Sequence, residues 1–336
     1  MKRVVLTVTN DIFSDQRLAR TAGTLHKNGY HVTLIGRRLK SSPPVTRPYT
    51  VVRYRLLCNK TFLFYACYNI VLFSDLLFRR YDIAIANDLD TLPACHLASW
   101  LRRKKIVFDS HELFPEVPEL IHRPFTKKVW ILLERVFIKR QKRCITVCDS
   151  VADYYKNKYG CSFTVVRNVS EKVKYSDDLK SIPVLPQPLL IYQGALNKAR
   201  GIEKMIKAMK FLPEFHLLIA GTGDIEKELK HLAADEGLSE KIIFTGRLSP
   251  GILKAYTRQA LLGLSLEENT GLNYYYALPN KLFDYLQAGI PVLVSDFPEM
   301  KRIVETYKTG MCTLEKDPEK LAAIIRLMID SGEYPI

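Results

Sequence analysis

The feature that most constrains the fold of this chain is a regular alternation of short apolar runs with longer stretches of helical spacing. In the first half the apolar runs are Val4–Thr9, His31–Ile35, Val51–Leu57, Ile83–Ala86, Lys105–Phe108, Cys144–Val147 and Phe163–Val166. In the second half they are Leu189–Tyr192, His216–Ala220, Lys241–Phe244, Leu261–Leu266 and Pro291–Val294. Apolar strands separated by helices predict parallel sheets whose two faces are both covered by helices.

The pattern is interrupted once, by a stretch rich in Ser, Asp and Pro over residues 171–188. Such a composition is typical of a linker, and 336 residues suit two domains. We therefore predict an N-terminal domain over 1–170, a linker over 171–188 and a C-terminal domain over 189–336. The expected fold class is α/β, with two doubly wound Rossmann-like domains whose strands end at a shared cleft, where ligands of such sheets bind.

The charge of the chain is concentrated in one half. Residues 1–180 carry 32 Lys and Arg against 16 Asp and Glu, a net charge of +16, whereas residues 181–336 carry a net charge of −1. An excess of this kind indicates an anionic partner, such as a membrane surface, a phosphorylated lipid or a nucleic acid. No nucleic-acid-binding module is recognised, so the membrane surface is the favoured partner and nucleic acid is not expected.

The cysteines and the apolar runs suggest a compartment. The seven cysteines are scattered without a Cys-x-x-Cys pair or a zinc-ligand spacing, which favours reduced, buried thiols and predicts no metal site. The apolar start before Asn10 is too short for a signal peptide. The run Thr61–Phe78 is interrupted by Asn69 and Asp75 and falls short of the roughly 20 residues of a spanning helix. We expect a cytoplasmic protein, peripheral on the inner face of the membrane.

The most informative segment for function is Leu278–Ser295. Pro279 is expected at the first position of a short helix, Gly289 at its end, and an apolar strand follows. A helix start presents free N–H groups to a phosphate. Lys281 adds a positive charge there, and Asp284 on the same face can accept two hydrogen bonds from a ribose diol. The alternative is an ordinary exposed ion pair on a helix surface.

Three glycine sites follow strands of the second half: Gly194, with Arg200-Gly201 opening the next helix; Gly221-Thr222-Gly223; and Gly246. Glycine allows a backbone to approach a ligand closely, although turns after parallel strands use glycine for structural reasons as well. Gly221-Thr222-Gly223 lacks the third glycine of a dinucleotide fingerprint, which argues against a nicotinamide enzyme.

In order along the chain, these sites resemble the donor half of the GT-B retaining glycosyltransferases of family 4, often called group 1. The resemblance rests on Gly194…Arg200-Gly201, Ile219–Gly223, Phe244–Gly246, Ser265–Glu268 and Pro279–Tyr285 with Ala288–Val292. In the first half Asn10–Arg17, Asn87–Pro93 and Asp109–Glu112 look like acceptor-side loops of the same family. The likeness extends over nearly the whole chain.

For the donor, the resemblance implies that Arg200 and Lys281 hold the diphosphate and that Asp284, where the family usually has Glu, binds the ribose. Gly194, Gly221, Gly223, Asn273 and Asn280 are the further donor-binding candidates. Glu268 is the candidate for the first of the family's two acids. Glu268 and Asp284 stand sixteen residues apart, twice the family's usual spacing, because residues 269–277 are inserted, so the identity of the first acid is open. Ala195 stands where the family often has Arg.

For catalysis, the resemblance implies that His111 lies near the sugar and the acceptor, with Asp15, Gln16, Arg17, Asp88 and Glu112 as acceptor-side candidates. The alternative for His111 is a hydrogen-bonded histidine of a loop. The implied mechanism is a front-face displacement assisted by the leaving diphosphate, with no metal and no cofactor besides the nucleotide-sugar co-substrate.

Two segments of the basic half combine apolar and positive side chains. The helix predicted over 127–142 has an apolar face, a tryptophan and a basic rim, as interfacial helices do. The aromatic helix over 62–78 ends in Arg79-Arg80, and Leu101–Lys105 adds a further basic patch. The alternative is that these stripes pack in the core while the charges are solvated.

Together these observations predict a metal-independent, retaining glycosyltransferase that moves a sugar from a nucleotide-sugar to a lipid-linked or surface-glycan acceptor. Two alternatives remain open: a catalytically inactive, membrane-associated relative, favoured by Ala195, Asp284 and the stretched acid pair, and a nucleotide-sugar epimerase of the same fold. Turnover of a sugar nucleotide distinguishes an active enzyme from the inactive relative. Product analysis without acceptor distinguishes a transferase from an epimerase.

Overall fold

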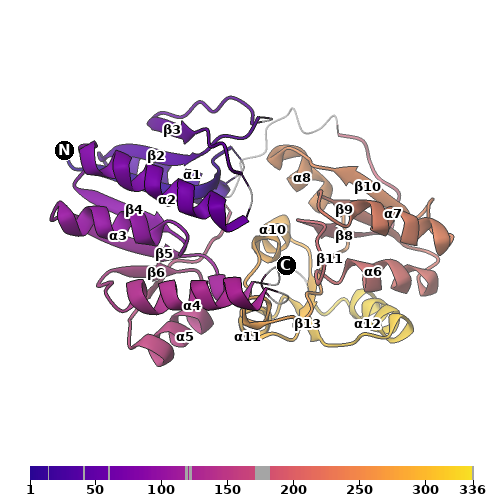
Figure 1. Ribbon diagram of the computed structural model, residues 1–336. Helices are drawn as coiled ribbons and strands as arrows, with labels where there is room; N and C mark the ends of the chain where they lie inside the picture. Colours follow the sequence, from indigo (N-terminus) through magenta and orange to yellow (C-terminus); the bar gives the residue numbers. More distant parts are fainter. Residues whose placement is uncertain are drawn as a thin grey trace. The chain divides into compact units, whose positions relative to one another are not determined.

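The computed structural model describes residues 1–13, 15–40, 42–59, 61–117, 120, 123–170 and 182–334. The chain divides into two compact units, Met1–Asn168 and Val169–Ile336. Most of the predicted linker, residues 171–181, lies outside the described residues. Each unit is an α/β body built on its own parallel sheet (Figure 1), which confirms the predicted fold class of two Rossmann-like domains.

Among the described residues of the N-terminal unit, seven parallel strands form one sheet in the order β3-β2-β1-β4-β5-β6-β7. The strands are β1 (Arg3–Asp11), β2 (His31–Arg37), β3 (Thr50–Tyr54), β4 (Ile83–Asn87), β5 (Lys105–Ser110), β6 (Cys144–Thr146) and β7 (Thr164–Val165). The helices are α1 (Gln16–Lys27), α2 (Thr61–Phe78), α3 (Leu92–Leu101), the 3-10 turn η1 (Phe114–Glu116), α4 (Pro124–Ile138) and α5 (Asp149–Tyr159).

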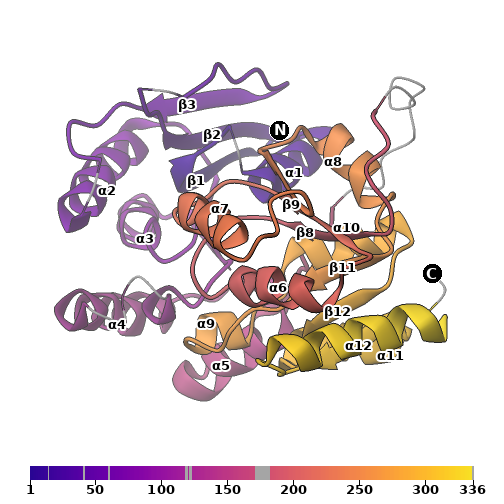
Figure 2. The same cartoon turned by 90° about the vertical axis from the view of Figure 1, so that its right-hand side faces the viewer.

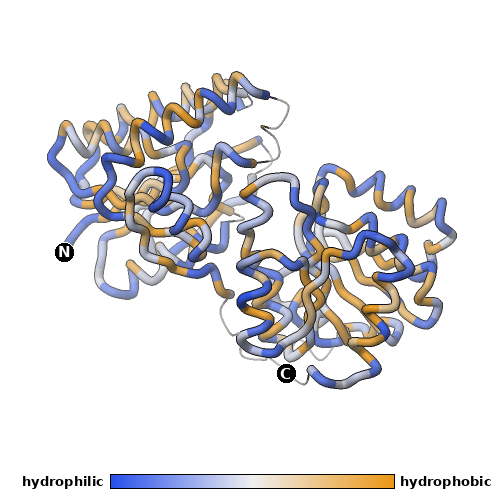
Figure 3. Tube along the Cα trace, turned by 90° about the horizontal axis from the view of Figure 1, so that it is seen from below, coloured by the Kyte–Doolittle hydropathy of each residue, from blue (hydrophilic) through white to orange (hydrophobic). Residues whose placement is uncertain are grey.

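The strand order places the helices of this unit on two faces. From β1 to β2 the chain moves toward the β3 edge of the sheet, and from β4 to β7 it moves toward the opposite edge. Right-handed crossovers therefore put α1 on one face of the sheet and α3 and α4 on the other. Figures 1 and 2 show α2, α3 and α4 lying side by side on that second face. In Figure 3 the most hydrophobic stretches run through the interior of each unit, and the outer helices alternate between apolar and polar residues.

The basic helix lies three to four residues earlier than the sequence predicts. It begins at Pro124 and ends at Ile138, not at 127 and 142. Proline at the first position fixes a helical φ and needs no donor there. At the other end, short-range bonds from Gln141 N to Ile138 O and from the Gln141 amide to Phe137 O close the last turn. The basic residues 139–143 therefore form a turn that leads into β6.

The aromatic helix α2 is, among the described residues, the one helix that is long and apolar enough to span a membrane by length and composition. The prediction that this run is too short to span a membrane is wrong by length and composition, although core helices of soluble proteins meet the same criterion. α2 turns Phe64, Tyr68 and Leu72 inward, all nearly inaccessible, and the Tyr68 hydroxyl donates to Val8 O at 2.5 Å. One face of the helix is thus part of the core of the unit.

In the described part of the C-terminal unit, six parallel strands form a sheet in the order β10-β9-β8-β11-β12-β13. They are β8 (Leu189–Gln193), β9 (His216–Ala220), β10 (Ile242–Gly246), β11 (Leu262–Ser265), β12 (Val292–Ser295) and β13 (Gly310–Thr313). The helices are α6 (Ile202–Ala208) with the 3-10 turn η4 (Met209–Phe211), α7 (Glu226–Asp235), α8 (Pro250–Thr257), α9 (Leu272–Tyr275), α10 (Asn280–Ala288), α11 (Pro298–Tyr307) and α12 (Pro318–Ser331).

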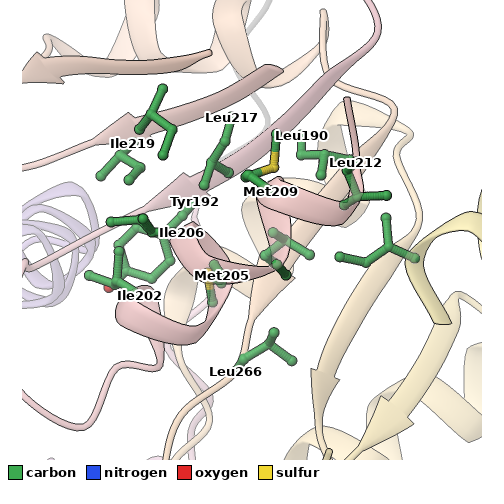
Figure 4. Packing of buried hydrophobic residues seen from close by; sticks show 14 of the residues in the cluster. Leu190, Tyr192, Ile202, Met205, Ile206, Met209, Leu212, Leu217, Ile219 and Leu266 are labelled. Atoms are coloured by element: carbon green, nitrogen blue, oxygen red, sulfur yellow. The ribbon is translucent and has the colours of Figure 1, made fainter. Parts of the chain in front are cut away.

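Three elements of this unit have no counterpart in the sequence prediction: α9, α11 and β13. β13 is a short edge strand whose residues are all only partly buried, so it carries no apolar run for a pattern to detect. α9 has four residues, too few for a helical period. On another part of the sheet the core is apolar; Figure 4 shows Ile202, Met205 and Ile206 of α6 packed against β8 and β9.

The turns after β8 and β9 are so close that only glycine fits at one of them. A Cβ added to Gly221 would lie 1.8 Å from Gly194 O, and its φ of +152° favours glycine as well. We predict that Gly221→Ala lowers the free energy of unfolding by about 2–5 kcal/mol, from backbone strain plus overpacking. Gly237→Ala is the matched control, because Gly237 also has positive φ but has open space around it; it should cost only about 1–2 kcal/mol. Equal effects in urea unfolding would contradict the close-contact argument.

Candidate functional site

In the C-terminal unit, two glycine turns, a glutamate and a lysine gather at the carboxyl edge of the sheet. Gly194 follows β8, Gly221 follows β9 and Glu267 follows β11. Lys281 lies in the first turn of α10. The carboxyl ends of parallel strands meet at one edge, where such folds bind ligands, so residues distant in sequence become neighbours here.

A buried charge cluster lies at the centre of this edge. Lys281 Nζ is 3.0 Å from Glu267 Oε1, and Arg200 Nη1 is 3.8 Å from the same oxygen. The exposed fractions of the Glu267 and Lys281 residues are 2% and 8%. Burial alone raises the pKa of Glu267, but Lys281, Arg200 and the Ser265 hydroxyl outweigh it and lower that pKa below its usual value. Glu267 is therefore ionised at neutral pH.

The Lys281 ammonium faces the glycine turn after β8. A Cβ added to Gly194 would lie 3.6 Å from Lys281 Cε and 3.8 Å from Nζ. The ammonium also lies 4.0 Å from the centroid of the Tyr192 ring, a cation–π contact. Glu267 thus faces two cations, Lys281 and Arg200, beside a turn without a side chain. This combination suits an anion.

Arg200 is held by two features of the chain. Gly201 has φ +70°, and a Cβ on it would lie 1.9 Å from Leu266 O, so glycine brings the loop of Arg200 against the residues that follow β11. The Arg200 guanidinium lies over the ring of Tyr274 at 4.7 Å, and Tyr274 belongs to α9. The inserted residues 269–277 therefore supply an aromatic platform for this cation.

Asp284 lies in a second polar cluster at the same edge. Its Oδ2 accepts from Gln193 Nε2 at 2.8 Å, and Gln193 Oε1 in turn accepts from the Thr257 hydroxyl at 2.8 Å. The Ser170 hydroxyl donates to Asp284 Oδ1. Gln193 immediately precedes Gly194, so the carboxylate lies within the same group of loops as the cations.

The structure corrects two details of the segment 278–295. Pro279 is the N-cap, in an extended conformation, and α10 begins at Asn280; with proline before the helix, its fixed φ shapes the entry rather than the first turn. Lys281 and Asp284 contact different partners, Glu267 and Gln193, and do not form an exposed pair. Gly289 ends the helix in the left-handed conformation at φ +76°, as predicted.

The remaining donor-side candidates lie at the periphery of the cluster. Glu268 is exposed, and its N–H donates to Ala199 O. Asn273 is partly buried on α9 and Asn280 is exposed. Gly223 packs against Leu196, whose carbonyl oxygen would lie 2.3 Å from an added Cβ. The acid that contacts both cations is Glu267, which the sequence argument missed; its place directly after an apolar strand was the available signal.

The N-terminal unit holds a second polar cluster, around His111 after β5. His111 Nδ1 is 3.4 Å from Asp88 Oδ2, and Nε2 is 3.3 Å from Asp109 Oδ2. Arg17 Nη2 lies 2.9 Å from Asp109 Oδ1. Burial alone lowers the pKa of His111, but Asp88 and Asp109 outweigh it and raise that pKa to about 9. The imidazole is therefore protonated at neutral pH.

Backbone geometry fixes this cluster. Asp88 adopts a left-handed conformation at φ +64°, and its Oδ1 accepts from the His111 N–H at 2.7 Å. A non-glycine residue in this region is strained, which is common where a side chain must be aimed. Of the other acceptor-side candidates, Asp15 caps α1 through Leu18 N, while Gln16 and Glu112 are exposed. Asp109 was missed, although it stands two residues before His111.

The residues that the structure describes include no group of three or more His, Cys, Asp or Glu side chains placed to hold a metal ion.

The chain matches two family models that together cover most of its length. Residues 177–335 match the model described as Glycosyl transferases group 1, and residues 16–169 match Glycosyltransferase Family 4. Curated relatives include an uncharacterized glycosyltransferase, MJ1607, of Methanocaldococcus jannaschii, 27% identical over 55% of this chain. The amylovoran biosynthesis glycosyltransferase AmsK of Erwinia amylovora is 29% identical over 53% of this chain. The matches span 46% and 45% of these relatives, about half of their length.

Solved structures share the fold over the whole chain. Sucrose-phosphate synthase from Thermosynechococcus elongatus superposes with a TM-score of 0.79 at 16% identity, covering 99% of this chain and 91% of that one. Anabaena Alr3699/HepE, solved in complex with UDP-glucose, superposes with a TM-score of 0.73 at 15% identity, covering 99% and 91%. The two family models and the shared fold agree with the resemblance seen in the motifs. The chain belongs to the GT-B group 1 glycosyltransferases.

Proposed function

We propose that this protein is a metal-independent, retaining glycosyltransferase that moves a sugar from a nucleotide-sugar to a lipid-linked or surface-glycan acceptor. The observation that carries the proposal is the buried cluster of Lys281, Arg200 and Glu267 beside the Gly194 turn. Two cations against one carboxylate, at the carboxyl edge of a doubly wound sheet, fit a bound diphosphate.

Each side chain of the cluster has a role in this proposal. Arg200 and Lys281 bind the diphosphate, and Glu267 holds the two cations in place before the donor arrives. Asp284, anchored by Gln193, accepts from the ribose diol. Because these groups are already ordered, they stabilise the charge that develops on the diphosphate without reorganising during the reaction.

The proposed transfer proceeds on one face of the sugar. The bond between the anomeric carbon and the diphosphate oxygen breaks, and the acceptor hydroxyl oxygen forms the new bond on the same face. The acceptor proton passes to the departing diphosphate. The enzyme contributes positioning and the positive charge of Arg200 and Lys281. His111, protonated and held by two carboxylates, contributes a fixed positive charge on the acceptor side.

The comparisons support the classes of donor and acceptor. Anabaena Alr3699/HepE was crystallised with UDP and with UDP-glucose, and AmsK is described as an amylovoran biosynthesis enzyme. We therefore propose a nucleotide-sugar as the donor and a polysaccharide as the class of product. The positive charge of residues 1–180 supports a lipid-linked acceptor at the inner face of a membrane.

The proposal is tested by a thermal-shift screen of UDP, GDP and ADP and their sugars, followed by hydrolysis assays with the nucleotide-sugars that bind. A ligand that binds the native state raises the melting temperature in proportion to its affinity. We expect one nucleoside diphosphate to stabilise the protein and its sugar to be slowly hydrolysed without acceptor. Binding without turnover would favour the inactive relative, and no binding across the panel would remove the proposed function.

We predict that Asp284→Ala weakens binding of the stabilising nucleotide about tenfold to a hundredfold, the usual effect of losing hydrogen bonds to a charged group. Asp235→Ala is the control, because Asp235 is an exposed carboxylate at the end of α7 in the same unit. Isothermal titration gives the affinities, and a urea midpoint close to that of the parent protein shows that the fold is kept. Unchanged affinity would exclude Asp284 from the nucleotide site.

A further inference from the structure

The outer faces of α2, α3 and α4 carry most of the exposed apolar side chains of the N-terminal unit. Of the fifteen large hydrophobic side chains exposed in its described residues, eleven belong to these three helices. They are Phe62, Leu63, Ile70, Val71, Phe78, Leu97, Trp100, Leu101, Phe125, Val129 and Leu132. Because the helices lie side by side (Figures 1 and 2), these residues form one surface, which we call the α2–α4 surface.

The same surface is bordered by cations, and its three helices carry no exposed acid. The exposed basic residues of α4, of the turns that follow α2, α3 and α4, and of the first position of β5 are Arg80, Arg103, Lys105, Lys128, Arg135, Lys139, Arg140, Lys142 and Arg143. The three helices contain only two acids. Asp75 is bound by Arg79, and Glu134 is buried against Lys158. An apolar area with a positive rim and no exposed carboxylate on its helices is complementary to an anionic lipid bilayer.

Two hollows of the surface combine an apolar wall with cations. One, of about 680 Å³, is lined by Trp100, Arg103, Lys104 and Lys142 among others. The other, of about 540 Å³, is formed on α4 by Leu132, Val136, Arg135 and Lys139 with Arg140. Arg103 has φ +52°, a conformation that strains a non-glycine residue and is kept where the surroundings demand it. Trp100 is 70% exposed, as expected of a tryptophan that completes its burial in the headgroup region.

The position of the first hollow leaves the His111 cluster free. Lys104 lies directly before β5, and His111 directly after it. The hollow and the proposed acceptor-side cluster are thus at opposite ends of the same strand. A headgroup bound in the hollow therefore does not contact His111.

We propose that the α2–α4 surface docks the protein on an anionic lipid bilayer, with the hollow beside Trp100 receiving a phospholipid headgroup phosphate. The proposal deepens the proposed function by naming the surface that brings the enzyme to its lipid-linked acceptor, and it rests on that function only for this purpose. Apolar side chains of α4 insert at the headgroup level, and the basic rim adds attraction that salt weakens.

The test is flotation of the full chain with vesicles of phosphatidylcholine alone or mixed with phosphatidylglycerol, in the absence of donor. We expect binding only to the mixed vesicles, decreasing as salt rises. Lys139→Glu should weaken partition at least about fivefold, since each cation near an anionic surface contributes roughly this factor. Leu132→Ser should weaken it by a similar factor through lost apolar burial.

Matched controls come from the C-terminal unit. Leu327 on α12 is 60% exposed and Leu132 is 59% exposed, so Leu327→Ser removes an equally exposed leucine from elsewhere. Lys227→Glu reverses an exposed charge on α7 in the same way. Both controls should float like the parent protein. Equal losses in the controls and in the α4 variants would overturn the proposed surface, as would equal binding to neutral vesicles.

Tryptophan fluorescence gives a second readout. The chain has two tryptophans, Trp100 and Trp130, and Trp130 is buried at 6% exposure. Mixed vesicles should therefore shift the emission of Trp100 to shorter wavelength, and Trp100→Tyr should abolish the shift. Inorganic phosphate alone should produce none. A shift with phosphate alone, or flotation without any shift, would contradict the placement of a headgroup beside Trp100. Donor hydrolysis measured without vesicles reports on the proposed function independently of these results.

Discussion

Glu267→Gln should lower the free energy of unfolding of the C-terminal unit by about 3–5 kcal/mol, the usual cost of removing one partner of a buried ion pair. The substitution keeps the shape of the side chain but leaves Lys281, 8% exposed, and Arg200 without the carboxylate that balances them. Both tryptophans lie in the N-terminal unit, so unfolding of the C-terminal unit is best followed by calorimetry. Glu268→Gln is the control. The carboxylate of Glu268 is exposed, so its loss should change stability little.

The same variant distinguishes between two roles of the cluster, a purely structural one and the binding of a ligand. If Arg200 and Lys281 bind the diphosphate of the donor, a nucleoside diphosphate supplies the negative charge that Glu267→Gln removes. Its stabilising effect should then be larger in the variant than in the parent protein. If the cluster only supports the fold, the variant is destabilised and the nucleotide shifts neither protein more than the other. That result would count against the diphosphate site even if the stability loss is as expected.

Helix α10 shows which features of the site a sequence pattern can predict. Gly289 ends the helix in the left-handed conformation because few other residues adopt it without strain, and this local rule needs no tertiary context. Pro279 is compatible with both the N-cap and the first turn, so local rules leave its place open by one residue. The partners of Lys281 and Asp284 come from the loop after β11 and from β8, respectively. The spacing of residues within α10 therefore cannot predict these partners.

The choice between Glu267 and Glu268 shows the same limit. Neighbouring residues at a strand end point in different directions, and which one faces inward depends on where the strand stops. β11 ends at Ser265, whose hydroxyl donates to Glu267 at 2.8 Å, and Ser295 of β12 donates to the Glu267 carbonyl at 2.6 Å. These contacts depend on the pairing of β11 with β12, a long-range fact that the pattern of apolar runs predicts only as a sheet, without register.

The pH dependence of stability should carry the signature of His111. Its pKa is raised from the ordinary 6.5 to about 9 in the native state, so the folded protein holds the proton more tightly than the unfolded chain. The resulting stabilisation is complete below about pH 6.5 and is lost as the pH rises through 9. With about 1.4 kcal/mol for each pKa unit, the native state should lose on the order of 3 kcal/mol over this range, relative to His111→Gln.

His96 provides a control of opposite sign. Burial and the nearby Arg140 lower its pKa below the ordinary value, so its effect on stability develops only as the pH falls below about 6.5. Urea unfolding followed by tryptophan fluorescence reports on the N-terminal unit. Above pH 6.5 the stability difference between the parent and His111→Gln should shrink with pH, while that between the parent and His96→Gln should stay constant. A constant His111 difference would mean that Asp88 and Asp109 do not hold a proton on the imidazole. His111 could then act as a neutral base toward the acceptor hydroxyl, whereas a protonated His111 can act only through its positive charge.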